Sequence, residues 1–122
     1  MKAKEKTEKK MSKKEEKNIA GAACSDPDCH VHGNLKARGR FFEGKVIKKF
    51  YKRVVIDFER TVYIKKYERY KKSRTKIHAR LPNCMKDSIN LGDYIRVQEC
   101  RPLSKIIHFV VINKIRDAEV KK

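Results

Sequence analysis

The chain has 122 residues, of which 33 are Lys or Arg and 15 are Asp or Glu, so its formal net charge at pH 7 is +18 and its pI is about 10.0. This length provides one hydrophobic core and excludes a second domain of ordinary size. A charge this far from zero indicates a polyanionic partner, either nucleic acid or an anionic membrane surface.

Hydropathy argues against a membrane protein or an exported one. No apolar run approaches the roughly 18 to 20 residues that a membrane span needs, and the Lys-rich start lacks the hydrophobic stretch of a signal peptide. We therefore expect a soluble, cytoplasmic protein, in which the four Cys residues are thiols or metal ligands rather than disulfides. A membrane surface would need a large apolar face beside the basic residues, and the sequence offers none, so we expect no membrane partner.

The two ends of the chain differ in composition from its centre. Residues 1–18 hold eight Lys and four Glu with almost nothing apolar, which predicts a basic disordered tail. This tail is either a solubilising segment or an arm that folds onto the partner. Residues 19–36 form a Cys- and His-containing N-terminal extension, residues 37–118 the folded domain, and residues 119–122 a short C-terminal tail.

From Arg38 onward, short runs rich in Val, Ile, Phe and Tyr predict strands. The last run is apolar on both faces, which is typical of a strand in the centre of a sheet. The five expected strands cover residues 38–50, 52–66, 73–82, 94–100 and 104–115.

Five short strands with no convincing helix between them predict an all-β fold, and a five-stranded barrel of the oligonucleotide-binding (OB) type fits them best. We expect a long basic loop between strands two and three and a flexible N-terminal extension. One alternative stays open, because Tyr63, Tyr67 and Tyr70 recur at helical spacing: residues 62–74 would then form a basic amphipathic helix. The β-branched residues at the start of this segment favour the extended form.

Positive charge is concentrated between Lys36 and Arg80, where 17 Lys or Arg accompany four Asp or Glu. Like charges at this density disfavour a compact state unless a polyanion supplies the missing acids, so nucleic acid is the expected partner. Tyr67, Tyr70 and His78 are expected to stack on unpaired bases or pack against ribose, which favours folded RNA over duplex DNA. The alternative for the two tyrosines is that they cover the end of the barrel.

The segment CSDPDCHVH contains residue types that bind zinc. Cys24, Cys29 and His32, spaced C-x4-C-x2-H, supply three of the four ligands of a structural zinc ion. The fourth ligand would be His30, Cys84 or Cys100.

The alternative is that Cys24 and Cys29 are reduced and idle, and that Cys84 and Cys100 are small buried hydrophobes. No cofactor is then required. No general base is evident near the cluster, so a catalytic zinc ion and an enzymatic function are not expected; Asp26 and Asp28 are interpreted as turn residues around Pro27.

The stretch GDYIRVQECRPLSKIIHFVV at residues 92–111 closely resembles the signature of the small-subunit ribosomal protein family numbered seventeen in bacteria and archaea and eleven in eukaryotes. Other segments agree in the same order: RGRFFEGKV at 38–46, KKYERYKKSRTKIHAR at 65–80 and LPNC at 81–84. The CSDPDCHVHG segment looks like the archaeal version. The resemblance spans roughly residues 24–112.

This resemblance implies a non-enzymatic OB-fold protein that binds small-subunit (16S-type) ribosomal RNA directly, helps assembly, and acts in translation as part of the small ribosomal subunit beside neighbouring ribosomal proteins. A homo-oligomer is not expected. In the family, the loop between strands two and three reaches into the RNA, and here it corresponds to residues 65–80. The runner-up function is a free OB-fold module that binds single-stranded RNA or tRNA, and a metal-dependent nuclease is a remote third.

The residues expected to contact RNA lie in two places. Most belong to the basic segment, and the others belong to the turn in ECRPLSK that the resemblance implies faces RNA. They are Arg38, Arg40, Lys45, Lys48, Lys49, Lys52, Arg53, Lys65, Lys66, Tyr67, Arg69, Tyr70, Lys71, Lys72, Arg74, Lys76, His78, Arg80, Arg101, Ser104 and Lys105. The chain departs from the family pattern at Arg53, where Thr is common, and at His30 and Val31, where Pro-Phe is common. The second departure leaves open which histidine is a ligand.

Overall fold

The computed structural model describes residues 24–118, and the predictions for residues 1–18 and 119–122 lie outside the described residues. The described part contains five strands and two 3-10 helices but no α-helix, which confirms the predicted all-β class. The elements are β1 (Phe41–Lys49), β2 (Arg53–Ile64), η2 (Lys65–Tyr67), β3 (Arg69–Arg80), η3 (Asn83–Met85), β4 (Tyr94–Glu99) and β5 (Phe109–Arg116).

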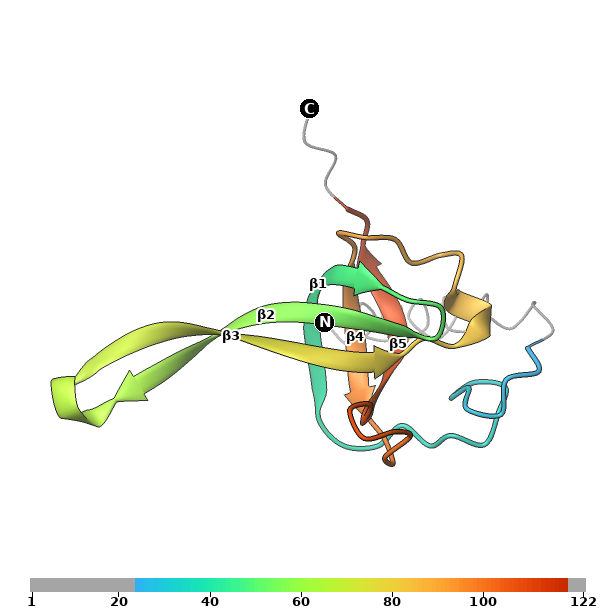
Figure 1. The fold of residues 1–122 in the computed structure, drawn as a ribbon, viewed down its shortest axis with the longest axis horizontal. Helices are drawn as coiled ribbons and strands as arrows, with labels where there is room; N and C mark the ends of the chain where they lie inside the picture. The colour runs from blue at the N-terminus through green and yellow to red at the C-terminus, as the bar shows by residue number, and fades with distance from the viewer. Residues whose placement is uncertain (1–23, 119–122) are drawn as a thin grey trace, which may run out of the picture.

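The five strands close into a barrel in the order β1-β2-β3-β5-β4 (Figure 1). Neighbours are antiparallel except β3 and β5, which run parallel. Strand β1 pairs with β4 through its first half and with β2 through its second half, and Lys45 has a partner on both sides. This closed five-stranded arrangement confirms the predicted OB-type barrel.

Gly44 lies where β1 passes from one neighbour to the other. A Cβ atom at this position would lie 2.8 Å from the carbonyl oxygen of Asp57 on β2. Only glycine permits the two backbones to approach so closely, so this residue allows β1 to coil around the barrel.

The hydrophobic core fills the barrel and extends beneath the connection that follows β3. Fully buried Val and Ile side chains from four strands meet inside it, and Leu81, Met85 and Ile89 cover one end. The barrel residues of this cluster are Val46, Val54, Ile56, Ala79, Ile95, Val97 and Val111.

Strand β5 begins later than predicted. Residues 104–108 form a tight turn instead, in which Leu103 N–H donates a 3.0 Å hydrogen bond to the carbonyl oxygen of Ile107. Val110 and Val111 point to opposite faces of the strand and are both buried, in agreement with a run that is apolar on both faces. Because the barrel is closed, each of its strands has two neighbours.

The expected long loop between strands two and three is instead a continuation of these strands. β2 and β3 pair without a register shift from Arg53↔Arg80 to Ile64↔Arg69, and η2 closes the hairpin. The alternative of an amphipathic helix over residues 62–74 is therefore wrong. Pairing along the hairpin satisfies the backbone groups, so strongly charged residues extend as strands well beyond the barrel (Figure 1).

Candidate nucleic-acid interface and metal centre

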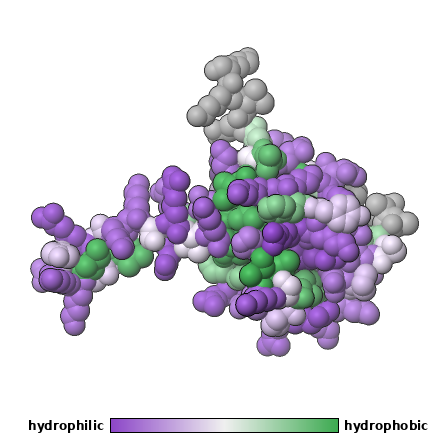
Figure 2. Space-filling model, in the orientation of Figure 1, coloured by the Kyte–Doolittle hydropathy of each residue, from purple (hydrophilic) through white to green (hydrophobic). Residues whose placement is uncertain are grey.

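The β2–β3 hairpin projects from the barrel (Figure 1). The pairing of β2 with β1 ends at Asp57, and Phe58 still packs against the core. The paired residues beyond it, 59–74, are called the arm below. Seven Lys or Arg and two Glu lie in this segment. All seven cationic residues are exposed: Arg60, Lys65, Lys66, Arg69, Lys71, Lys72 and Arg74. The arm is almost entirely hydrophilic in Figure 2 apart from small apolar patches.

Two glutamates do not neutralise this surface. Glu59 Oε1 lies 3.6 Å from Arg74 Nε, but both side chains are more than half exposed, so the pair is weak. Glu68 occupies the left-handed conformation that ends η2, with φ of 50°. The arm thus carries a surplus of five positive charges along a two-stranded ribbon.

Three tyrosines lie on the arm and are more than half exposed: Tyr63, Tyr67 and Tyr70. The rings of Tyr63 and Tyr70 face each other across the two strands, with centroids 5.0 Å apart, and Lys66 Nζ lies 5.4 Å from the Tyr67 ring centroid. The tyrosines therefore do not cover the barrel end, which was the alternative role considered for two of them. Tyr63 and Arg60 also lie on the arm but were not among the predicted contacts, because their strand was assigned to the barrel.

Other predicted contact residues lie on the barrel and its connections. The exposed ones are Arg38, Arg40, Lys45, Lys48, Lys52, Lys76, Arg101, Ser104 and Lys105, while Arg53 and His78 are half-buried. Arg101 lies beside the N-terminal extension, where its guanidinium donates a 3.2 Å hydrogen bond to Asp28. The seven cationic residues of the arm are the densest group along the sequence.

Two predicted contact residues are held by the protein itself. Lys49 Nζ donates 2.7 Å hydrogen bonds to the carbonyl oxygens of Lys86 and Ile89. Arg80 donates hydrogen bonds of 3.0 and 3.1 Å to the carboxylate of Asp26, and its side chain is only 14% exposed. The structure gives both residues a role in fixing loops to the barrel.

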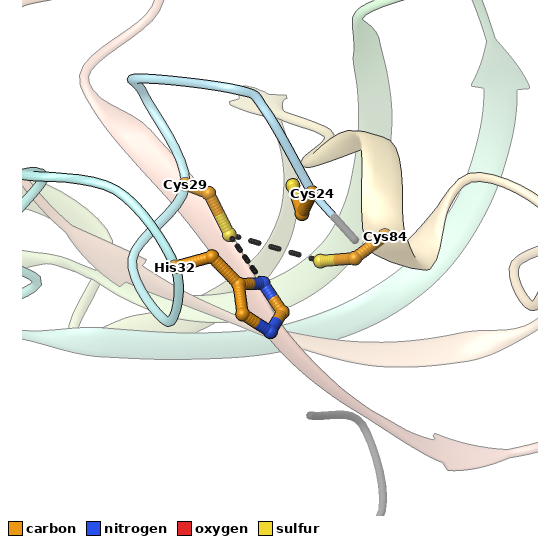
Figure 3. A group of neighbouring side chains, drawn as sticks. All are labelled: Cys24, Cys29, His32 and Cys84. Carbon is orange, nitrogen blue, oxygen red and sulfur yellow. Dashed lines mark hydrogen bonds between the residues drawn. The ribbon is translucent and has the colours of Figure 1, made fainter. Parts of the chain in front are cut away.

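The three predicted metal ligands lie together, and Cys84 joins them. The ligand atoms of Cys24, Cys29, His32 and Cys84 all lie within 4.8 Å of one another (Figure 3). Cys84 belongs to η3, whereas the other three come from the N-terminal extension. Cys100 is engaged elsewhere, with its Sγ 3.3 Å from the carbonyl oxygen of Arg101.

Two of the distances between these atoms match the edges of a tetrahedral zinc site. Cys29 Sγ lies 3.7 Å from Cys84 Sγ and 3.6 Å from His32 Nδ1. Zinc bonds of about 2.3 Å to sulfur and about 2.05 Å to nitrogen give tetrahedral edges of about 3.8 Å between two sulfurs and about 3.6 Å between sulfur and nitrogen. These two edges agree with zinc ligation, and all the separations between the four ligand atoms are no longer than 4.8 Å.

A tight turn in the extension positions the cluster. Gly33 N–H donates to the carbonyl oxygen of Cys29 at 3.0 Å, and Asn34 N–H donates to that of Pro27 at 3.1 Å. A Cβ atom at Gly33 would lie 2.4 Å from the Pro27 carbonyl oxygen, so the turn requires glycine here. The turn directs Cys29 and His32 toward the same point (Figure 3).

The thiols influence one another's ionisation. Burial and the neighbouring Cys29 and Cys24 sulfurs raise the pKa of Cys84 to about 12. The backbone hydrogen bond from Asp26 lowers the pKa of Cys24. A divalent cation would reverse the penalty at Cys84, because thiolates rather than thiols bind metals.

Known proteins are similar to this chain along most of its length. A family model described as Ribosomal protein S17 matches residues 44–113. The Small ribosomal subunit protein uS17 of Nanoarchaeum equitans is 53% identical over 94 residues, which cover 76% of this chain and 82% of the relative. The protein of the same name from Methanococcus maripaludis is 47% identical over 97 residues, covering 79% and 87%.

A third relative comes from Saccharolobus solfataricus and carries the same name. It is 43% identical over 98 residues, which cover 80% of this chain and 84% of the relative. All three matches reach beyond the span of the family model. Among residues 24–118, no helix has the length and apolar character needed to cross a membrane.

Proposed function

The chain belongs to the ribosomal protein S17 family, and from this premise we propose that it is a structural constituent of the small ribosomal subunit that binds small-subunit ribosomal RNA directly. Its role is non-enzymatic and lies in translation, in the cytoplasm. Ribosomal RNA and neighbouring ribosomal proteins are its partners.

The observation that carries this proposal is the arm, with its seven exposed cationic side chains, two acids and three exposed tyrosines. Cations that neutralise phosphates release condensed counterions, which supplies affinity without sequence information. Exposed aromatic rings add contacts to unpaired bases and riboses, which abound in folded RNA.

Because the backbone of the arm is already paired, RNA binding to this surface loses little conformational entropy. β2 and β3 are paired up to Ile64↔Arg69 in the free protein, so little backbone ordering remains to be done on binding. The closed barrel holds the base of the arm, and the exposed cations on the barrel contact further RNA segments. Binding of this kind favours the folded RNA over its alternatives by differential affinity.

A comparison of two RNAs tests the proposal. Binding of the full chain to a transcript of archaeal small-subunit ribosomal RNA is measured against an unrelated RNA of equal length, between about 50 and 200 mM salt. We expect tighter binding to the ribosomal transcript at every salt concentration and sedimentation of the chain with small subunits. Equal affinity for both RNAs, together with tight binding to short single strands or tRNA, would favour a free OB-fold module instead.

We further propose that Cys24, Cys29, His32 and Cys84 hold a structural zinc ion. Three sulfurs and one imidazole nitrogen form a donor set that zinc favours, and the edges of 3.7 and 3.6 Å support tetrahedral geometry. Four protein ligands leave no open position for a substrate, so the ion would be structural. It would join the N-terminal extension to η3.

A further inference from the structure

Two cysteines of the metal cluster lie far apart in the sequence but face each other in space. Cys29 belongs to the turn of the N-terminal extension, and Cys84 lies 55 positions later, in η3. Their Sγ atoms lie 3.7 Å apart and point toward one another (Figure 3). Both thiols are free. A covalent bond between them would cross-link the extension to the segment that follows β3.

Hydrogen-bonded turns fix the backbone beside each thiol. Cys29 N–H donates to the carbonyl oxygen of Asp26 at 3.2 Å, and Gly33 N–H donates to that of Cys29 at 3.0 Å. In η3, Met85 N–H donates to the carbonyl oxygen of Pro82 at 3.1 Å, and the Met85 side chain is buried in the core. The two sulfurs are thus brought together by anchored turns from separate parts of the fold.

The distance between the two sulfurs suits two different states. Two thiolates that share a tetrahedral zinc ion lie about 3.8 Å apart, and the observed separation is 3.7 Å. A disulfide needs about 2.05 Å, so the sulfurs have to approach by only about 1.7 Å once the ion has left. The same pair can therefore bind a metal when reduced and form a cross-link when oxidised.

The two thiols differ in their access to solvent. Cys29 is 0% exposed, whereas Cys84 is half-buried. A small oxidant in solution therefore reaches Cys84 first and finds Cys29 shielded behind it. A neighbouring thiol in this position converts an oxidised cysteine into a disulfide before further oxidation makes the damage irreversible.

We propose that Cys29 and Cys84 form a reversible disulfide when the protein meets a hydroperoxide, and that the zinc ion is released as this bond forms. The inference rests on the metal site proposed above and adds to it a site of oxidative modification. Zinc and the disulfide are then alternative links between the extension and η3. The extension stays joined to the barrel in both states.

The reaction balances with hydrogen peroxide as the oxidant. The Cys84 thiolate attacks one peroxide oxygen, the O–O bond breaks, and a sulfenic acid forms as hydroxide leaves. The Cys29 thiolate then attacks the Cys84 sulfur, the S–S bond forms, and a second hydroxide leaves. Two electrons have passed from the thiolates to the peroxide, and two protons from solvent convert both hydroxides to water. A small thiol reverses the reaction by thiol–disulfide exchange.

Controlled oxidation of the natively purified full chain tests the proposal. A modest excess of hydrogen peroxide is added, free thiols are alkylated, and a chromogenic chelator reports the zinc that is released. Digestion with trypsin and with a protease that cleaves at Asp26 and Asp28 separates Cys24 from Cys29, so mass spectrometry can assign the linked pair. We expect about one zinc ion released per chain and a link between Cys29 and Cys84.

Three variants and one stability measurement sharpen the test. The C24S variant keeps both partners and should still form the link, whereas C29S should not. The C100S variant is the matched control, because Cys100 lies outside the cluster, and it should behave as the wild type. After oxidation, a chelator should no longer lower the midpoint of thermal unfolding of the wild type, because the disulfide has replaced the metal.

Two results would overturn the inference. One is a main product in which Cys24 is linked to Cys29 or to Cys84, or in which the thiols become sulfinic acids without any cross-link. The other is an oxidised protein that keeps its zinc. Both are measured on the wild type, so they do not depend on the folding of a variant.

Failure of this inference is distinguishable from failure of the proposed metal site. The zinc content before oxidation tests the site by itself, and a chain that is purified without zinc contradicts both the site and the release of zinc. A zinc-loaded chain that forms no disulfide between Cys29 and Cys84 contradicts only the inference. Binding to ribosomal RNA is measured separately and is decided by neither result.

Discussion

Arg80, the last residue of β3, donates hydrogen bonds of 3.0 and 3.1 Å to the two carboxylate oxygens of Asp26. The two residues lie 54 positions apart, and their side chains are 14% and 3% exposed. Asp28 lies beside the same guanidinium, at 3.8 Å, and also accepts from Arg101. This ion-pair network joins the N-terminal extension to the barrel independently of any metal.

Loss of the Asp26 carboxylate should destabilise the fold strongly. The D26N variant leaves the guanidinium of Arg80 largely buried without its main partner, which costs about 3 kcal/mol of the free energy of unfolding. Urea unfolding at pH 7, followed by circular dichroism, measures this change. The E59Q variant is the control, because Glu59 pairs with Arg74 in solvent, and it should cost less than about 1 kcal/mol. Equal effects of the two substitutions would contradict the role of the buried pair.

Acid should weaken the protein through Asp26 and Asp93. Burial acts to raise the pKa of both carboxyl groups, but hydrogen bonds outweigh it and lower both pKa values below 3.8. The main hydrogen bonds come from Arg80 to Asp26 and from Lys114 to Asp93. A carboxylate with a lowered folded-state pKa stabilises the fold fully above its ordinary pKa, and this contribution is lost as the pH falls through the folded-state value.

The free energy of unfolding should therefore decline as the pH is lowered below about 4. The D93N variant should be less stable than the wild type at pH 7, and its stability should fall less steeply in acid. Unfolding curves of both proteins at a series of pH values make the comparison. Parallel pH profiles would show that Asp93 does not contribute to the acid sensitivity.

The strands could be predicted from the sequence where their side chains reach the core. Val54, Ile56, Ile95 and Val97 are fully buried, and their apolar runs mark β2 and β4. The start of β3 could not be predicted in this way, because residues 69–72 are exposed and carry no alternating apolar pattern. That part of β3 is extended because it pairs with β2, a relationship that a local pattern does not contain.

The residue types of the metal cluster and of the basic surface could be predicted from the sequence better than their arrangement in space. The spacing of Cys24, Cys29 and His32 indicates a metal cluster, but Cys84 lies 55 positions after Cys29 and reaches it only through the folding of η3 beside the extension. Charge alone also could not separate Lys49 and Arg80, which bind groups within the protein, from cations that remain free for phosphates.

Substitution of Cys84 should remove the metal and loosen the extension. We expect one zinc ion per natively purified chain, loss of this ion in the C84S variant, and a fall in stability of about 3 kcal/mol or more when the wild type is treated with a chelator. Elemental analysis and thermal unfolding measure the two effects. The C100S variant should keep its zinc, since Cys100 lies outside the cluster. Full zinc content in C84S would exclude Cys84 as a ligand.

Charge reversal on the arm should weaken RNA binding and alter its response to salt. Arg69 and Arg74 are both exposed on β3, so the R69E/R74E variant should fold normally. If both residues neutralise phosphates, the slope of log affinity against log salt should become shallower by about 2, and affinity for the ribosomal transcript should fall most at low salt.

The K36E/R116E variant is the matched control for this change. Lys36 and Arg116 are also exposed but lie outside the arm, and their reversal alters the net charge of the protein by the same amount. If the arm itself contacts the RNA, the slope should change much more in R69E/R74E than in this control. Equal changes in the two variants would instead mean that the total charge of the protein, acting at long range, governs binding.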